Sequence, residues 1–492
     1  MNTARRWLVL AVLSCALLIV VIDITVLYLA LPSLVRDLGA SPAEKLWIIN
    51  VYAVTIAGLL PAMGALGDRH GFRGIFILGL VTFGAASLMA ALSPLPLILI
   101  AARAVQAVGA AMMMPATLGL IRQVFDDPQE RAVAIGIWAA IASGGAALGP
   151  IVGGVLLEHF WWGVVFLINV PIVVIALILA LCWIPVGTRH LQRPFDLLSA
   201  VQALLALTGF TFAIKEVSSD HASPVVALMA LGVAVMAGVA FVRRQRRSRM
   251  PMMDFSLFRN ADFTAGALSA LAATLVLMGV ELAISQQFQL IQGLSPLAAG
   301  VAILPIPLAA FISGPAAGLL MPRLGVHRML VLSLTISAAG LLVYVLYQPV
   351  GQWLRIVTLA LFGLGLGATM TAASSAMLMS VPASRAGMAA SMEEVAFELG
   401  GSLGITLLGS LMSALYISAM DRPGVPLQAQ ASIDGALALA DTLPEASAGE
   451  LIPLAHAAFN SACEAVLLVA AVILVVLPIL LALLARQGRR PS

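Results

Sequence analysis

Long apolar stretches, separated by short polar segments, fill almost the whole chain. A helix needs about 20 apolar residues to cross the hydrocarbon core of a bilayer. A membrane-spanning β-strand needs only about ten alternating residues, so stretches of this length predict helices. We predict fourteen transmembrane helices, at residues 7–31, 46–66, 74–92, 97–121, 132–157, 160–184, 197–214, 223–242, 263–288, 296–321, 329–347, 353–378, 386–416 and 457–485.

The composition fits an all-α integral membrane protein. Apolar residues make up 61% of the 492 residues and charged residues only 10%, whereas soluble domains have about 45–50% and 25%. These values exclude a water-soluble enzyme, a disordered protein and a nucleic-acid binder. The three cysteines lie within apolar stretches and predict no disulfide framework. The first apolar stretch is too long for the core of a signal peptide, so we interpret it as a retained helix.

The distribution of basic residues predicts the topology. If the N-terminus is cytoplasmic, 20 of the 26 Lys and Arg fall in cytoplasmic segments and four in outer loops. Cytoplasmic loops of membrane proteins carry such an excess of basic residues. The bias therefore places both termini in the cytoplasm and agrees with an even number of spans. The basic run 243–249 directly follows a predicted helix, which favours an orientation signal over a nucleic-acid site.

An internal repeat divides the chain. Residues 64–73 and 318–327 share Gly, Arg and Gly at an offset of 254 residues, and the same offset relates the fifth helix approximately to the thirteenth. Two parallel repeats in one membrane are typical of transporters, whose substrate sites lie near the midplane. We predict a six-helix bundle at 1–187, an inserted helix pair with a basic loop at 188–250, and a second bundle at 251–492, with a long outer loop at about 419–454.

Acidic residues outnumber basic ones within the predicted helices. An acid at a helix centre costs on the order of 2.5–3.5 kcal/mol, unless it is paired, protonated or exposed to a watery cavity. A carboxyl that can be protonated or ionised can carry protons, and an ionised one can bind a cationic ligand. The intramembrane base is Arg103, which lies one turn before Gln106. The intramembrane acids are Asp23, Glu281, Glu393, Glu394, Glu398 and Glu464.

Each of these acids also has a structural interpretation. Asp23 could be satisfied by backbone groups or by Arg103, in which case the two form a structural pair. Glu394 and Glu398 lie on one helix face about 6 Å apart along the axis, and Glu393 points about 100° away. Glu393 and Glu394 could sit at water level at the cytoplasmic mouth. Glu281 and Glu464 could be interfacial, and the acidic outer loop could be a cation vestibule or a solvated loop with a short amphipathic helix.

Several kinds of chemistry have no residues to support them. The sequence contains no phosphate-binding Gly-x4-Gly-Lys-Ser/Thr segment, which argues against ATP-driven transport by this chain alone. All six histidines fall in predicted loops or at helix ends, so no intramembrane metal cluster is predicted. We therefore expect a transporter without cofactor or metal that is driven by the proton gradient.

Five segments, taken together, resemble the motifs of a known transporter family. The chain is similar over its whole length to the fourteen-helix drug:proton antiporters of the major facilitator superfamily, and most similar to quaternary-ammonium and methyl viologen resistance pumps. The resemblance implies the major facilitator fold in a bacterial cytoplasmic membrane. The segments are 22–32 on the first helix, 64–74 after the second, 99–111 on the fourth, 145–154 on the fifth and 166–171 on the sixth.

The resemblance also implies roles for three groups of residues. The first would form an inner gate that latches the two repeats, although Pro322 replaces the acid in the second copy of this loop. The second contains the antiporter motif and would shape the fifth helix for exchange. The third would handle protons and cationic drug. The groups are, in order, Asp68, Arg69 and Arg73; Gly145, Gly149, Pro150, Gly153 and Gly154; and Asp23, Glu393 and Glu394.

The predicted function is proton-coupled multidrug efflux by a functional monomer. Its substrates would be lipophilic mono- and dications such as quaternary ammonium compounds, methyl viologen, dyes and biguanide-type antiseptics. One alternative is export of a neutral or anionic amphiphile or metabolite, with Arg103 as the anchor of the ligand. Another is an intramembrane enzyme or a lipid-binding scaffold, against which the absence of a catalytic cluster argues.

Overall fold

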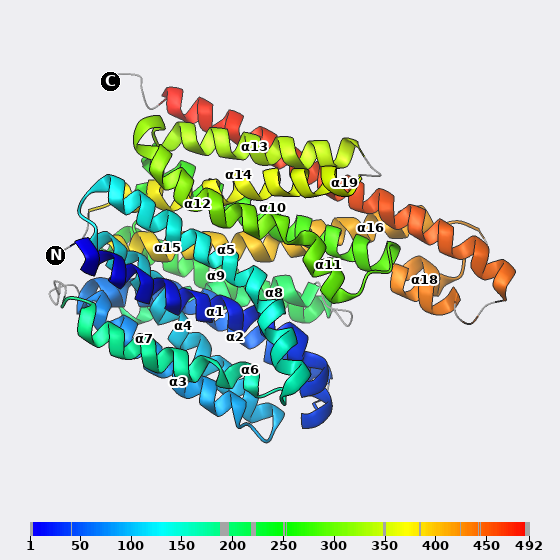
Figure 1. Cartoon of the computed structure of the whole chain (residues 1–492), viewed down its shortest axis with the longest axis horizontal. Coiled ribbons are helices and arrows are strands. Elements are labelled where there is room, and N and C mark those ends of the chain that lie inside the picture. Colours follow the sequence, from blue (N-terminus) through cyan, green and yellow to red (C-terminus); the bar gives the residue numbers. More distant parts are fainter. Residues whose placement is uncertain are drawn as a thin grey trace.

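The computed structural model describes residues 3–40, 42–186, 196–217, 223–248, 251, 253–347, 351–382, 385–423, 425–440, 442 and 444–487, and this part of the chain is helical without any strand. Thirteen stretches are long and apolar enough to cross a membrane. A further helix of 32 residues, α5 (Pro128–His159), lies among them, and the number fourteen stays a prediction. The long helices run side by side, and α1 begins at the same end of the molecule at which α19 finishes (Figure 1).

The helices of the first half follow the predicted stretches closely. The sixth predicted helix is interrupted at Ile168, so that Asn169 begins a new helix just before Pro171. The remaining elements are α1 (Thr3–Leu38), α2 (Pro42–His70), α3 (Phe72–Ala91), α4 (Pro96–Val124), α6 (Val164–Leu167), α7 (Asn169–Trp183), α8 (Leu197–Val217) and α9 (Pro224–Arg247).

Irregular turns divide two of the predicted helices in the second half and extend a third. The tenth is interrupted at Leu304, before Pro305, and π-helical turns extend the ninth and divide the thirteenth. The elements are η1 (Phe255–Arg259), α10 (Ala261–Gln286), η2 (Gln287–Ile291), α11 (Pro296–Ile303), α12 (Pro305–Leu324), α13 (Val326–Leu346), α14 (Gln352–Met379), α15 (Ala386–Leu403), η4 (Gly404–Leu408), α16 (Gly409–Met420), α17 (Leu427–Ala431), α18 (Ile433–Ala440) and α19 (Glu445–Gln487).

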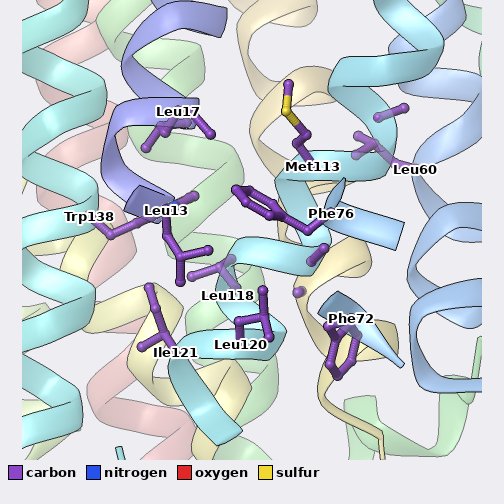
Figure 2. Close-up of a cluster of buried hydrophobic side chains, with 14 of the residues drawn as sticks. Leu13, Leu17, Leu60, Phe72, Phe76, Met113, Leu118, Leu120, Ile121 and Trp138 are labelled. Atoms are coloured by element: carbon purple, nitrogen blue, oxygen red, sulfur yellow. The ribbon is translucent and has the colours of Figure 1, made fainter. Parts of the chain in front are cut away.

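Two large hydrophobic cores and a smaller third one, which joins α1 to α4 and α6, hold the described helices together. The first joins α1 to α5 and α7, and reaches the start of α15. Figure 2 shows part of it, with Leu13 and Leu17 of α1 near Trp138 of α5 and with Phe72 and Phe76 of α3. The second joins α10, α12 to α16 and α19. The bundles meet where α2 packs on α15 and where α5 packs on α12.

The repeat seen in the sequence is present in the backbone. Gly71 and Gly325, one offset apart, both have positive φ, at 91° and 79°, and each precedes a helix. Only glycine adopts this conformation without strain, which explains why it recurs. The crossings of the bundles are related in the same way. Gly64 of α2 lies against the Gly387 carbonyl of α15, and Gly318 of α12 lies against Ala132 of α5.

The inserted pair lies beside the first bundle. α8 packs against α9 and against α2, where the Thr208 hydroxyl donates to the Val54 carbonyl oxygen at 3.3 Å. Trp47 of α2 stacks on Phe212 of α8, with ring centroids 5.8 Å apart. Much of α9 is exposed and apolar, as expected for a helix that faces lipid. The predicted domain limits at 187 and 250 lie outside the described residues.

Most of the described residues of the segment predicted as a long outer loop, at about 419–454, are helical, which is more helix than the single short amphipathic helix considered for it. α17 and α18 fold against the start of α19, which begins 12 residues earlier than predicted. Apolar side chains that the sequence spreads over this segment, including Ile433, Ala436 and Leu451, are buried in the second core. With 43 residues, α19 is about 65 Å long, so it projects far beyond a hydrocarbon core of about 30 Å (Figure 1).

Candidate functional site

Asp23 lies in the middle of α1 and is buried in the first bundle, 2% exposed. Its Oδ2 forms an ion pair with Nη1 of Arg103 on α4. Its Oδ1 accepts hydrogen bonds from the side-chain amides of Gln106, at 2.8 Å, and Asn169, at 2.9 Å. Gln106 also donates to Ser87 of α3 at 2.9 Å. Both carboxylate oxygens are therefore bonded by side chains of α4 and α7, within a network that spans α1, α3, α4 and α7.

The pairing of Asp23 with Arg103 is the structural alternative that the sequence left open. Leaving either charge buried without its partner would be strongly unfavourable. In this conformation Asp23 is matched by a cation of the protein itself. Its role in proton or cation coupling stays a prediction. Gln106, which the sequence placed one turn after Arg103 on the predicted fourth helix, belongs to the same network.

Aromatic rings complete the surroundings of Arg103. Its guanidinium carbon lies 4.2 Å from the centroid of Tyr52 on α2 and 5.7 Å from that of Phe166 on α6. Such contacts orient a buried guanidinium by the attraction between its charge and the ring face. Arg103 is only 1% exposed, so it is enclosed by its acid and the two rings.

The acids of α15 have different surroundings. Glu393 is fully buried and accepts a hydrogen bond from the Ser374 hydroxyl of α14, while its Oε2 has no partner among the described residues. Glu394 is 2% exposed, and its Oε1 also lacks a hydrogen-bond partner within the described part of the chain. No Lys or Arg of the described ranges pairs with either carboxyl group. Glu398 is partly exposed.

The helical repeat separates the directions of these acids. Gly387 and Ser391 of α15 contact Gly64 of α2. Because residues spaced by three or four share a helix face, Glu394 and Glu398 continue this face toward the outer end and point toward the first bundle. Glu393 instead meets α14 of its own bundle. The adjacent pair is thus divided between the interface and the interior of the second bundle.

Glu281 and Glu464 lie in the second bundle and are both partly exposed. On α19, Asn460 donates to Glu464 at 2.7 Å and accepts from Gln287 at 2.6 Å. Glu464 therefore belongs to a polar network between helices. On α10, Gly279 contacts Leu408, and the Ala283 carbonyl accepts from Cys463. Gly279 and Ala283 are four residues apart and share a face of α10, so Glu281, about 200° around the helix from Gly279, lies on the opposite face.

The predicted gate residues separate into two groups. Asp68, at the end of α2, accepts hydrogen bonds from the backbone N–H groups of Gly387, at 3.0 Å, and Met388, at 3.2 Å. It thus caps α15 across the bundle interface, where the helix dipole favours a negative charge. Arg73 donates to the Leu181 carbonyl oxygen of its own bundle at 2.8 Å. Arg69 is half-buried, and its Nε lacks a partner in the described ranges.

A second contact crosses the same interface, and the sequence did not predict it. Arg122, at the end of α4, donates to the carbonyl oxygens of Leu378 and Val381 around the end of α14. A cation is favourable at a helix C-terminus, as an anion is at an N-terminus. Asp68 and Arg122 therefore engage opposite ends of two neighbouring helices of the second bundle. Together with the Gly64–Gly387 contact, they close this end of the molecule.

The antiporter motif lies along the contact between α5 and α1. Gly145 faces Leu18 and Val21, and Gly149 lies directly against Thr25. Gly153 faces Val26, whereas a side chain at Gly154 would meet open space. The small residues thus allow close approach of the two helices. The side chain of Pro150 lies outside the described residues, and the helix runs through this position.

The structure adds three groups to the predicted site. Tyr52, Ser87 and Ser374 carry no charge and occur in ordinary apolar helices, so the sequence offered no signal for them except the expectation that buried acids need donors. Among the described residues, no three His, Cys, Asp or Glu side chains gather to hold a metal ion.

Comparisons with known proteins place this geometry in a family. Residues 13–405 match the sequence model of the Major Facilitator Superfamily. The methyl viologen resistance protein SmvA of Salmonella typhimurium is 39% identical over 462 residues, which cover 92% of this chain and 93% of SmvA. The multidrug efflux pump LfrA of Mycolicibacterium smegmatis is 39% identical over 475 residues, covering 95% and 94%. A tetracenomycin C resistance and export protein of Streptomyces glaucescens is 30% identical over 93% of this chain and 87% of its own.

Solved structures share the fold at low sequence identity. The human organic anion transporter MFSD10 superposes with a TM-score of 0.64 at 14% identity, covering 96% of this chain and all of that one. The proton:xylose symporter XylE gives 0.61 at 12% identity, covering 85% and 91%. The sequence match, the helical architecture and the solved structures lead to one conclusion: this chain is a multi-pass membrane transporter, not an enzyme, and belongs to the Major Facilitator Superfamily.

Proposed function

We propose that this protein exports lipophilic cations across the bacterial cytoplasmic membrane in exchange for protons, and that the acids of α15 carry the exchange. One observation carries the proposal. Glu393 and Glu394 are buried, each has an oxygen without a hydrogen-bond partner, and no Lys or Arg of the described residues pairs with them. An ionised carboxylate in such a place is strongly unfavourable, so each group needs a proton or a foreign cation.

The relatives support this class of substrate. SmvA is named for resistance to methyl viologen, which is a dication, and LfrA for multidrug efflux. We infer a substrate range of quaternary ammonium compounds, methyl viologen, cationic dyes and biguanide-type antiseptics. A lipophilic cation would meet apolar helix surfaces with its body and the α15 acids with its charge. Protons and drug would then compete for the same carboxyl groups.

The state of Arg103 argues against the anionic alternative. An anchor for an anionic ligand needs a cation whose charge no carboxylate of the protein already neutralises, but Arg103 is paired with Asp23 and enclosed by Tyr52 and Phe166. A ligand at this place would have to displace a fully hydrogen-bonded carboxylate. The negative charge left without a partner in the second bundle favours a cation instead.

The closed end of the molecule fits alternating access. By the predicted topology, α15 begins at the cytoplasmic side, so the contacts of Asp68 and Arg122 close that side. Rocking of the two bundles about the site would open one side as the other closes. In this scheme the pH gradient and the membrane potential supply the work, and no cofactor takes part.

The test is proton release on drug binding. Purified protein in weakly buffered detergent solution receives methyl viologen or tetraphenylphosphonium while the pH is recorded. We expect proton release from the unmodified protein, and its loss in Glu394→Gln and reduction in Glu393→Gln. Glu464→Gln is the matched control, because it removes an intramembrane acid that Asn460 already satisfies. Undiminished release from both α15 variants, or binding without any release from the unmodified protein, would overturn the proposal.

A further inference from the structure

Tyr52 has an unusual position between the two charged sites. It lies on α2 and is 2% exposed, and its hydroxyl has no hydrogen-bond partner among the described residues. A buried hydroxyl without a partner is unfavourable and uncommon. Such a group therefore points to a partner that it meets in another state of the molecule.

The ring of Tyr52 has a clear role in this conformation. Its face lies 4.2 Å from the guanidinium carbon of Arg103, which is the counter-ion of Asp23. The ring is thus part of the wall that keeps Arg103 against its acid. Through this contact, α2 is attached to the charge pair formed by α1 and α4.

The hydroxyl of Tyr52 lies in the field of both bundles. It interacts electrostatically with Asp23 and Arg103 in its own bundle, and with Glu398 of α15 in the other. Glu398 lies on the face of α15 that turns toward α2, one turn beyond Glu394. α2 also crosses α15 at Gly64 and Gly387. Among the helices of the first bundle, α2 therefore links the charge of Glu398 to the Asp23–Arg103 pair most directly.

We propose that Tyr52 is a positioning residue that couples the two charged sites, with its ring holding Arg103 on Asp23 and its hydroxyl donating to Glu398 when that carboxylate is ionised. A proton or a cationic drug on the α15 acids removes the need for this donor. The occupancy of α15 is thereby communicated to the Asp23–Arg103 pair. This inference rests on the proposed function and assigns the link between its two halves.

Charged groups lie on every helix that packs against α2, and three of them, Asp23, Arg103 and Glu398, interact electrostatically with Tyr52. Two other charged groups lie at helix ends and bond elsewhere: Arg73 of α3 to the Leu181 carbonyl oxygen, and Glu216 of α8 to the Ser223 N–H. The inner groups are Asp23 of α1, Arg103 of α4 and Glu393, Glu394 and Glu398 of α15, with Glu281 on the adjacent α10.

The test compares the pH profile of drug-induced proton release in Tyr52→Phe and in the unmodified protein. Phe keeps the ring and removes the donor. Without the donor, the α15 carboxylate holds its proton to higher pH, so the upper limb of the profile moves up by about one pH unit, a tenfold change. Tyr344→Phe is the matched control, since this buried hydroxyl lies in the second bundle near Gln287. It should leave the profile unchanged.

Two further variants separate the ring from the hydroxyl. A fluorinated tyrosine at position 52 is a stronger donor of similar shape and should move the limb in the opposite direction, to lower pH. It also serves if Tyr52→Phe does not fold. Tyr52→Leu removes the ring, and we expect loss of transport that Phe at this position largely restores. In a Glu398→Gln background, Tyr52→Phe should cause no additional shift.

The outcomes distinguish this inference from the proposed function. Three results would overturn the role of Tyr52: a pH profile of Tyr52→Phe that superimposes on that of the unmodified protein, an equal shift in Tyr344→Phe, or an undiminished shift in the Glu398→Gln background. Proton release that depends on Glu394 would still support the proposed function. Absence of proton release from the unmodified protein would overturn both.

Discussion

Replacing Asp23 by Asn should destabilise the protein more than neutral replacement of a partly exposed acid. The substitution leaves the guanidinium of Arg103 buried and charged, with Gln106 and two aromatic rings as its remaining partners. The reciprocal change, Arg103→Gln, leaves Asp23 with the amide donors of Gln106 and Asn169. The double variant removes both charges and leaves a neutral polar network.

The magnitude follows from burial. Asp23 and Arg103 are 2% and 1% exposed, and breaking a buried pair by removing one partner costs about 3–5 kcal/mol. In Asp23→Asn, the aromatic rings near Arg103 stabilise its unpaired charge by about 0.5–2 kcal/mol, so we expect a net cost of about 3 kcal/mol. For Arg103→Gln, which leaves Asp23 with its two amide donors, we expect a cost of about 2 kcal/mol. The double variant should lose only about 1 kcal/mol, because no unmatched charge remains.

The assay is a double-mutant cycle on the unfolding of the purified protein in detergent, with Asp254 and Arg385 as the reference pair. That pair has side chains 21% and 40% exposed and should couple by less than about 1 kcal/mol. Coupling between Asp23 and Arg103 should reach about 4 kcal/mol. Additive single substitutions, or a cost of Asp23→Asn no larger than that of Asp254→Asn, would refute the permanent pairing.

Three other outcomes follow from the contacts of the closed end and of α15. Asp68→Ala removes the cap of α15, a change of about 0.5–2 kcal/mol, so a cysteine at Ser391 should react about twofold to thirtyfold faster. An Arg73→Gln control, whose contact stays within one bundle, should not change this rate. Hydrogen bonds from Arg244 lower the pKa of Asp196 to about 2. The pair is exposed, so it should stabilise the protein by less than about 1 kcal/mol. This stabilisation is present above the usual pKa of an aspartate, near 4, and is lost as the pH falls toward 2. The thermal midpoints of Asp196→Asn and the unmodified protein should therefore differ by a constant amount between pH 5 and 8 and converge below pH 4. Glu398→Gln should weaken binding of methyl viologen about tenfold more than binding of tetraphenylphosphonium, because the carboxylates of Glu394 and Glu398, about 6 Å apart along the helix, can together neutralise a dication. Fluorescence competition measures both affinities, and equal losses would contradict this account.

Most of the fold could be predicted because the bilayer imposes one spacing on every span. The apolar stretches located the long helices, and the repeated Gly71 and Gly325 marked equivalent turns of the two halves. The outer segment was missed for the same reason. Outside the bilayer, length no longer distinguishes a helix from a loop, and the folding of α18 onto α19 depends on contacts between apolar side chains far apart in sequence.

The candidate site could be predicted as a set of residue types but not as a set of pairs. Each intramembrane acid was visible in the sequence because charge is rare there. Which acid finds Arg103 depends on how α1 and α4 are rotated within one bundle, and no pattern along either helix specifies this. Uncharged partners such as Ser374 carry no distinguishing signal in an apolar helix, so only the structure identifies them as partners of the buried acids.

The two bundles stabilise their buried acids in different ways, and this difference indicates different functions for the two sites. Asp23 has a cation of its own, so this pair is neutral whether or not a ligand is present. Glu393 and Glu394 have none among the described residues, so these two carboxyl groups must obtain positive charge from outside. A site with a permanent partner cannot alternate between proton and drug without first losing that partner, whereas a site without one has to be filled by one or the other at every stage. Exchange is therefore expected at α15, and the Asp23–Arg103 pair is expected to respond to it through the helices that separate them.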